Sequence, residues 1–532
     1  MPGGEAAAAN SAGHAAMKAG DAATAARQFA RAVALAPDAF DFRLNHAIAL
    51  NAVGRPAEAL QALRRVEDTG RANAAYCSTR GTVERALGDK AGAAQWYDLA
   101  LALDPQRPRA LHGRARTAIE RGEPDALVRF DQALAANPAD PDLWLGKAQA
   151  LDALGQRADA RALMEQIAAQ APAWGEGLRF LAQLRLAAGE SDFAAHYAEA
   201  VERVPGDPGL PVEWARVLSG HDRNGEAAEV MARARAAFPD MPRLALLHAG
   251  YLSASGDDAQ AEALFAASTL EDEERLVQEG RHALRRGDLM RAETVLSRAL
   301  ALNPDSIAGW ALRDLGWRLS GDARHDWLHG QDGLVRMVPL RDADKVLPPA
   351  IARLHDLHDS ASFPLGQSLR GGTQTRGLLF DRHEPEFAAL HGAIRDTLDD
   401  YRNNLPPHDA AHPLLKHRDR QWHVTGSWSV RLSHGGDHHA PHLHPEGIVS
   451  SACYCELPGE AAMATHERAG WIELGRPAPD LRLDLQPIVS LEPVEGHLAL
   501  FPSTLYHGTR PFPRGRRMTV AFDATANQGM RR

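Results

Sequence analysis

Glycine recurs along the first 320 residues of this chain at a nearly constant spacing. Successive members of the series lie 31 to 36 residues apart, most often 34: Gly20, Gly54, Gly88, Gly122, Gly155, Gly189, Gly220, Gly256, Gly287 and Gly321. A period of about 20 to 50 residues indicates a stack of similar units, each of which buries its apolar face only against its neighbours. The spacing therefore predicts an all-α repeat solenoid over residues 1–325.

The repeat that turns at Gly155 shows why each unit should be a helical hairpin. Apolar residues are spaced three or four apart on both sides of the glycine, as in two amphipathic helices: Trp144, Ala148, Leu151, Leu154, Ala160, Leu163, Met164 and Ile167. Pro172 ends the second helix. The pattern resembles the tetratricopeptide repeat family, with about ten repeats and its least regular part between Gly220 and Gly256. The resemblance implies a groove that binds a protein or peptide, or that serves self-association into a homo-oligomer.

Composition narrows the class of protein. A chain of 532 residues needs at least two domains. Its net charge of -10 and pI of about 6.2 disfavour a nucleic-acid partner. Three cysteines give no disulfide framework, and neither a secretory signal nor a membrane-spanning apolar run is visible. We therefore expect a cytoplasmic protein without a membrane partner.

The helical pattern stops near residue 325, and we expect a linker at 325–345 and a second domain at 346–532. Helical periodicity indicates helices at 350–357 and 385–401. Short β-rich runs separated by Gly and Pro follow at 427–432, 450–457, 488–491, 497–501 and 518–522. Such a set of strands predicts a sandwich or jelly-roll barrel.

A histidine motif gives this second domain its chemistry. His442 and His444 are two residues apart and would lie on one face of a strand. His507 follows 63 residues after His444, and Arg517 ten residues later. This is the layout of a mononuclear metal site with a cation nearby that binds an anion.

The runs around these histidines resemble the 2-oxoglutarate/Fe(II) oxygenase superfamily, in its branch related to prolyl hydroxylases. The resemblance rests on His442-Leu443-His444-Pro445, on Phe501-Pro502-Ser503 before His507, and on Arg517 to Phe522. It covers about residues 420–525 and implies a double-stranded β-helix. It also implies Fe(II) as cofactor, 2-oxoglutarate as cosubstrate, and O2 as oxidant.

The resemblance assigns His442 and His507 as metal ligands, but His444 stands where most of the superfamily has an aspartate. Three alternatives follow. His444 completes a three-histidine site, which we favour. In the second alternative, Glu446 supplies a carboxylate ligand in a site with His444 and His507. In the third, His444 does not bind the metal and leaves an open position.

The same resemblance assigns the cosubstrate site. Arg517 would pair with the distal carboxylate of 2-oxoglutarate, because a guanidinium presents two parallel donors. Tyr454 and Thr519 would add hydroxyl contacts, whereas Arg516 would face the other side of the strand. We expect His434, His438 and His439 to be solvated loop residues.

These observations predict a 2-oxoglutarate- and Fe(II)-dependent dioxygenase that hydroxylates an unactivated C–H bond. The repeats would recruit a protein or peptide substrate, an inference from fold analogy. The alternative function is a non-catalytic tetratricopeptide scaffold whose C-terminal domain is inactive or binds metal as a cupin does.

Overall fold

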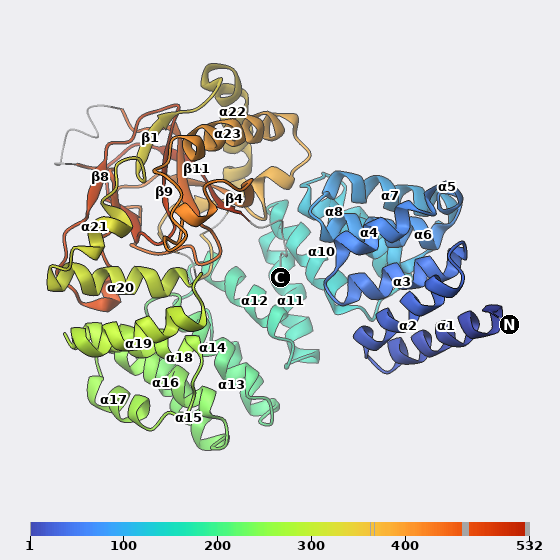
Figure 1. Cartoon of the computed structure of the whole chain (residues 1–532), viewed down its shortest axis with the longest axis horizontal. Coiled ribbons are helices and arrows are strands. Elements are labelled where there is room, and N and C mark those ends of the chain that lie inside the picture. The colour runs from blue at the N-terminus through green and yellow to red at the C-terminus, as the bar shows by residue number, and fades with distance from the viewer. Residues whose placement is uncertain (1, 362, 367, 460–467, 527–532) are drawn as a thin grey trace. The chain divides into compact units, whose positions relative to one another are not determined.

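The computed structural model of the chain describes residues 2–361, 363–366, 368–459 and 468–526 (Figure 1). These residues form two compact units. Among the described residues, the first comprises 2–156 with 380–384, and the second comprises 157–379 with 385–526. No helix in the described ranges is long and apolar enough to cross a membrane.

The first unit is built from helical hairpins. Its helices are α1 (Pro2–Lys18), α2 (Ala22–Leu35), α3 (Phe40–Ala52), α4 (Pro56–Arg64), α5 (Glu67–Gly70), α6 (Ala74–Ala86), α7 (Lys90–Leu103), α8 (Pro108–Glu120), α9 (Ala126–Ala136) and α10 (Pro141–Ala153). The hairpins pack through small residues. Gly146 of α10, for example, lies against the Phe130 ring of α9, and a Cβ there would come within 2.1 Å of that ring.

Hairpins of the same kind continue in the second unit. Its helices up to the sheet are α11 (Arg157–Gln170), α12 (Gly175–Ala187), α13 (His196–Arg203), α14 (Gly209–Ser219), α15 (Asn224–Ala237), α16 (Pro242–Ser255), α17 (Asp258–Ala266), α18 (Glu273–Arg285), α19 (Leu289–Leu302), α20 (Ile307–Ser320) and α21 (Arg324–His329). The predicted class, a tetratricopeptide solenoid followed by a sheet domain, is confirmed.

A glycine and the aspartate after it build several of the turns. Gly256 ends α16 in the left-handed conformation with φ 99°, which costs a glycine little. Asp257 then caps α17 by accepting a hydrogen bond from the backbone N–H of Gln260. The turn at Gly220 differs, since its φ is -61° and Asp222 adopts the left-handed conformation instead. The distortion lies where the glycine spacing is least regular.

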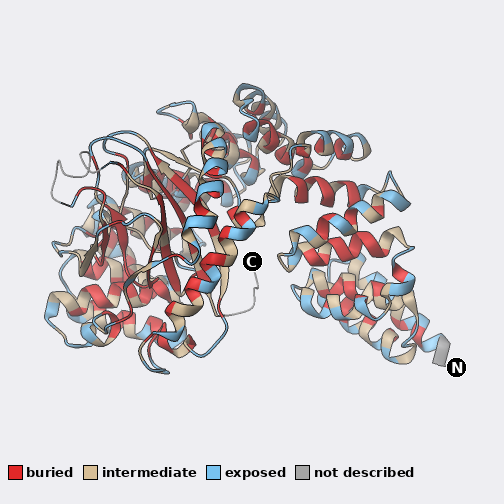
Figure 2. Cartoon of the chain, turned by 90° about the horizontal axis from the view of Figure 1, so that it is seen from above, coloured by how far each residue is buried: buried red, intermediate tan, exposed pale blue. Residues whose placement is uncertain are grey.

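The C-terminal part of the second unit contains antiparallel sheets. The strands are β1 (Arg336–Pro339), β2 (Leu369–Arg370), β3 (Thr373–Gln374), β4 (His423–Leu432), β5 (His438–His439), β6 (Val449–Glu456), β7 (Ile472–Leu474), β8 (Val489–Leu491), β9 (His497–Pro502), β10 (His507–Thr509) and β11 (Arg517–Thr525). They form a six-stranded sheet in the order β1-β9-β6-β11-β4-β3, a three-stranded sheet β10-β7-β8, and the pair β2-β5. Most residues of β6, β9 and β11 are buried, in keeping with the red strands in Figure 2.

Two long helices accompany the sheets, α22 (Ala343–Ser360) and α23 (Pro385–Asn403), with short 3-10 turns η1 (Leu379–Asp381), η2 (Leu415–His417) and η3 (Pro479–Leu481). The segment expected to be a linker, 325–345, instead holds most of α21, the edge strand β1 and the start of α22. Strand β1 pairs with β9, so that Arg336 lies opposite Leu500.

The last repeats and the sheet domain share one hydrophobic core. Leu284 of α18 and Leu315 of α20 pack in the same cluster as Leu481 of η3 and Tyr506. Because Tyr506 directly precedes His507, this shared core holds the α18 region beside the segment that carries the third histidine.

Candidate metal centre

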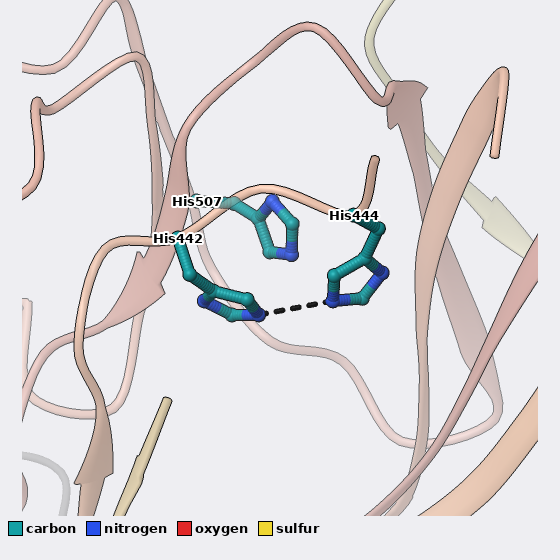
Figure 3. A group of neighbouring side chains, drawn as sticks. All are labelled: His442, His444 and His507. Carbon is teal, nitrogen blue, oxygen red and sulfur yellow. Dashed lines mark hydrogen bonds between the residues drawn. The ribbon is translucent and has the colours of Figure 1, made fainter. Parts of the chain in front are cut away.

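The three predicted histidines meet at one point, although none of them lies in the middle of a long strand. His442 and His444 belong to the loop between β5 and β6, and His507 begins β10. The expectation that His442 and His444 share a strand face is wrong. His442 is instead held by an isolated bridge, in which its N–H and carbonyl pair with the carbonyl and N–H of His507 at 3.0 Å. One ligand nitrogen from each histidine lies within 4.8 Å of the other two (Figure 3).

Hydrogen bonds determine which nitrogen each ring presents. Nδ1 of His442 lies 2.9 Å from the carbonyl of Ala440, and Nδ1 of His507 lies 3.1 Å from the carbonyl of Leu505. A carbonyl oxygen only accepts, so Nδ1 carries the proton in both rings. Each neutral ring then presents the lone pair of Nε2.

The Nε2 atoms point toward one another. Nε2 of His442 and Nε2 of His444 are 3.0 Å apart, as the dashed line in Figure 3 marks. Burial lowers the pKa of His442 to about 3 and holds the pKa of His507 well below its usual value, so both rings are neutral near pH 7. Convergent neutral imidazoles suit a borderline divalent metal such as Fe(II), Zn(II) or Ni(II).

A carboxylate that we did not predict lies behind His444. Asp523 of β11 accepts a hydrogen bond from Nδ1 of His444 at 2.6 Å, and the hydroxyl of Ser450 donates to the same oxygen at 3.3 Å. A carboxylate in this position fixes the tautomer and orientation of a metal-binding imidazole. A signal was available, since Asp523 is an even number of residues from Arg517 on β11 and therefore shares its strand face.

The other candidates are placed less closely. Glu446, the alternative ligand, is exposed and does not belong to the group of three histidines. His434 is exposed, as expected, whereas His438 is half-buried. His439 is also half-buried, and its ring stacks on that of His442 at a centroid distance of 5.9 Å, so it is not a solvated loop residue.

The residues assigned to the cosubstrate lie on two neighbouring strands. Arg517 is buried and its guanidinium carbon lies 5.1 Å from the centre of the Tyr454 ring. Thr519, also buried, pairs with Tyr454 across β11 and β6. Arg516 is exposed and pairs with Glu456, as expected for the other side of the strand.

Two polar groups beside each other have unused hydrogen-bonding capacity. The hydroxyl of Tyr454 is buried and has no hydrogen-bond partner among the described residues. Arg517 donates to the carbonyl of Gly470, but no carboxylate in the described ranges forms an ion pair with it. A buried cation and hydroxyl of this kind fit a ligand that carries a carboxylate.

Gly508 allows the histidine loop to approach β10. A Cβ at this position would lie 2.9 Å from the carbonyl oxygen of His439 and 3.0 Å from the nitrogen of Pro441. The absent side chain therefore lets His442 form its bridge with His507.

A cavity of about 830 Å³ opens onto His442 and His444. Its walls include His442, His444, Asp523 and the indole of Trp428, whose ring contacts His444 edge-on at 5.2 Å between centroids. An aromatic wall beside convergent polar groups is typical of a ligand site.

Comparison with known proteins found similarities in both the repeat region and the sheet region. Residues 426–523 match the family model described as "Putative 2OG-Fe(II) oxygenase". Two tetratricopeptide repeat models match residues 10–76 and 124–184. The protein FlbA of Caulobacter vibrioides is 31% identical over 136 residues, which are 25% of this chain and 23% of FlbA. The match thus spans less than a quarter of that relative's length.

Solved structures with similarity to the chain include repeat proteins. A tetratricopeptide repeat protein from Parabacteroides merdae is 15% identical, with a TM-score of 0.29, and the match covers 59% of this chain and 99% of that one. Yeast Tom70 is 13% identical, with a TM-score of 0.35 and coverage of 60% and 83%. By its family matches, the chain joins tetratricopeptide repeats to a C-terminal region similar to 2-oxoglutarate/Fe(II) oxygenases.

Proposed function

We propose that the protein is a 2-oxoglutarate- and Fe(II)-dependent dioxygenase that hydroxylates a protein or peptide. The observation that carries the proposal is the convergence of three imidazoles, those of His442, His444 and His507, whose ligand nitrogens lie within 4.8 Å of one another. All three Nδ1 atoms have oxygen neighbours within hydrogen-bonding distance, which leaves Nε2 of each ring for a metal.

In this proposal His442, His444 and His507 hold the iron. Bound iron and 2-oxoglutarate would supply the oxidation of a C–H bond, with succinate, CO2 and the hydroxylated product formed from substrate, 2-oxoglutarate and O2. Asp523 would keep His444 turned toward the metal. Arg517 and Tyr454 would bind the distal carboxylate, with Thr519 beside them.

The substrate class is inferred from the repeats and the cavity. Tetratricopeptide repeats are matched in the chain, and such repeats commonly bind proteins. The cavity of about 830 Å³ is lined by sheet-domain residues such as Trp428 and also by Ser219 and Asp222 of the repeat region. A substrate held by the repeats would therefore have a route to the histidines.

A second candidate function is a scaffold with an inactive or cupin-like metal domain. The observation that favours it is the third imidazole, His444, in place of the carboxylate found in most of the superfamily. The buried Arg517, which forms no ion pair in the described part of the chain, favours the oxygenase instead.

Slow substrate-free decarboxylation of 2-oxoglutarate distinguishes the two functions. We expect the Fe(II)-loaded protein to form succinate from 2-oxoglutarate in air, measured by proton NMR. The variant His507→Ala should form none above the level of free Fe(II). Equal succinate from both proteins would contradict the oxygenase proposal.

A further inference from the structure

A second cavity, of about 300 Å³, lies over the first helices of three successive repeats. Tyr251 of α16 and Gln278 of α18 line it, together with Ser219 at the end of α14. It shares Ser219, Asp222 and Asp480 with the cavity of the histidines. The two cavities therefore meet at these three residues.

Arg281 of α18 lines the smaller cavity and has an unusual surrounding for an arginine. Its Nη2 donates to the hydroxyl of Tyr506 at 3.2 Å. Its Nε is buried without a hydrogen-bond partner in the described ranges, and no ion pair of Arg281 is found there, although, despite burial, the nearby charge of Asp480 raises its pKa. The neighbouring Arg285, by contrast, is paired with Asp480.

A guanidinium that lines a cavity and has an unused N–H donor favours an anion as its ligand. Burying a charge is costly unless it is paired, and a carboxylate accepts two parallel N–H donors from one arginine. Asp480 and Asp222 line the same cavity, and their charges would repel a phosphate dianion more strongly than a monoanionic carboxylate. Gln278 can donate to and accept from a peptide backbone.

We propose that Arg281 binds an acidic side chain of the peptide substrate and thereby positions a nearby residue of that peptide at the histidine cavity. This inference rests on the proposed function and makes the substrate an Asp- or Glu-containing segment. The position fits the role, because the contact residue Tyr506 directly precedes His507. A peptide side chain held at Arg281 would lie beside the segment that supplies the third imidazole.

The test measures peptide binding by the full-length protein without iron or O2. Degenerate peptide pools that differ at one fixed position, Glu, Gln, Lys or phosphoserine, are compared by fluorescence anisotropy. We expect the dissociation constant of the Glu pool to be at least about tenfold lower than that of the Gln pool, as for one charge-assisted pair. In Arg281→Gln the two pools should differ by less than about twofold, and Arg281→Lys should retain part of the preference.

The matched control is Arg286→Gln. Arg286 directly follows α18, its side chain is 45% exposed, and it does not line the cavity. The substitution Arg286→Gln removes the same charge as Arg281→Gln and should leave the preference for the Glu pool unchanged. Metal content after Fe(II) loading should equal that of the parent in both glutamine variants.

Three results would overturn the inference. They are equal binding of the Glu and Gln pools, a Glu preference that survives in Arg281→Gln, and a phosphoserine pool that binds more tightly than the Glu pool. Loss of metal in Arg281→Gln with an unchanged preference would assign Arg281 to holding Tyr506 alone. Because binding is read without iron or 2-oxoglutarate, failure of the oxygenase proposal would be seen separately, as absent succinate formation.

Discussion

The carboxylate of Asp523 lies 2.6 Å from Nδ1 of His444, whose other ring nitrogen, Nε2, lies 3.0 Å from Nε2 of His442. Most of the superfamily that this region resembles has an aspartate at the position of His444, whereas this chain has an imidazole with a carboxylate behind it. In the proposed site this pair would keep a negative charge near the metal, while His444 would supply one of the three ligand nitrogens.

The first prediction concerns this pair. Asp523→Asn should weaken Fe(II) binding about 10- to 100-fold, because His444 loses the partner that fixes its tautomer. Anaerobic equilibrium dialysis measures the dissociation constant. The control is Glu446→Gln, which removes an exposed carboxylate from the same loop and should leave the affinity unchanged. If Glu446→Gln loses the metal and Asp523→Asn keeps it, Glu446 is the ligand.

The second prediction concerns the ligands themselves. His442→Ala and His507→Ala should each lower bound iron from about one equivalent to near zero, since two imidazoles remain. Elemental analysis after anaerobic loading with Fe(II) gives the amount of iron bound per protein. His434→Ala is the control, because that histidine belongs to the same region but its side chain is 84% exposed. Iron retained in His507→Ala would remove His507 from the site.

The third prediction concerns the cosubstrate. Arg517→Gln should weaken 2-oxoglutarate binding by about 10-fold or more, the loss expected for a charge-assisted pair in a buried site. Isothermal titration with Zn(II)-loaded protein measures the affinity without turnover. Arg516→Gln carries the same charge change on an exposed side chain and should bind 2-oxoglutarate like the parent. Similar affinities for Arg517→Gln and the parent would show that the anion binds elsewhere.

The fourth prediction concerns stability and pH. His358 is buried between Thr373 and Ser429, and burial lowers its pKa to about 3 from 6.5. Between pH 3 and pH 6.5 the folded state binds fewer protons at His358 than the unfolded chain does. The free energy of unfolding therefore keeps its full value above pH 6.5 and decreases as the pH falls toward 3. Because of His358, the free energy of unfolding of the metal-free protein should decrease by about 1.5 kcal/mol between pH 6.5 and pH 5.

Urea unfolding of the parent and His358→Gln at both pH values measures this difference. The variant, which does not titrate, should lose less stability than the parent over the same interval. A parallel decrease in both proteins would show that His358 ionises freely in the folded state.

Much of the helical architecture could be predicted because repeat contacts are local in sequence. Gly256 and Asp257 together specify a turn and the start of the next helix within two residues. The strand β1 was missed because Arg336–Pro339 is short, ends in proline and owes its structure to pairing with β9, about 160 residues away. No local pattern reports such a pairing.

Some residues of the candidate site could likewise be predicted from the sequence, and others could not. His442, His444 and His507 stand in recognisable runs, and Arg517 follows at a fixed distance from His507. Asp523 was missed, because its contact with His444 depends on how β11 lies against the loop after β5. The role of Arg281 is also invisible in the sequence, where it is one of many helix arginines. Only the placement of the neighbouring side chains reveals that its Nε has no hydrogen-bond partner among the described residues.

The central claim is tested most directly by anaerobic titration of the purified protein with Fe(II) and 2-oxoglutarate, followed by visible absorption. We predict a weak charge-transfer band from 2-oxoglutarate bound to iron through two oxygens, saturating at one equivalent and absent in His442→Ala and His507→Ala. Bound iron without such a band at saturating 2-oxoglutarate would contradict the oxygenase proposal and favour a cupin-like metal domain.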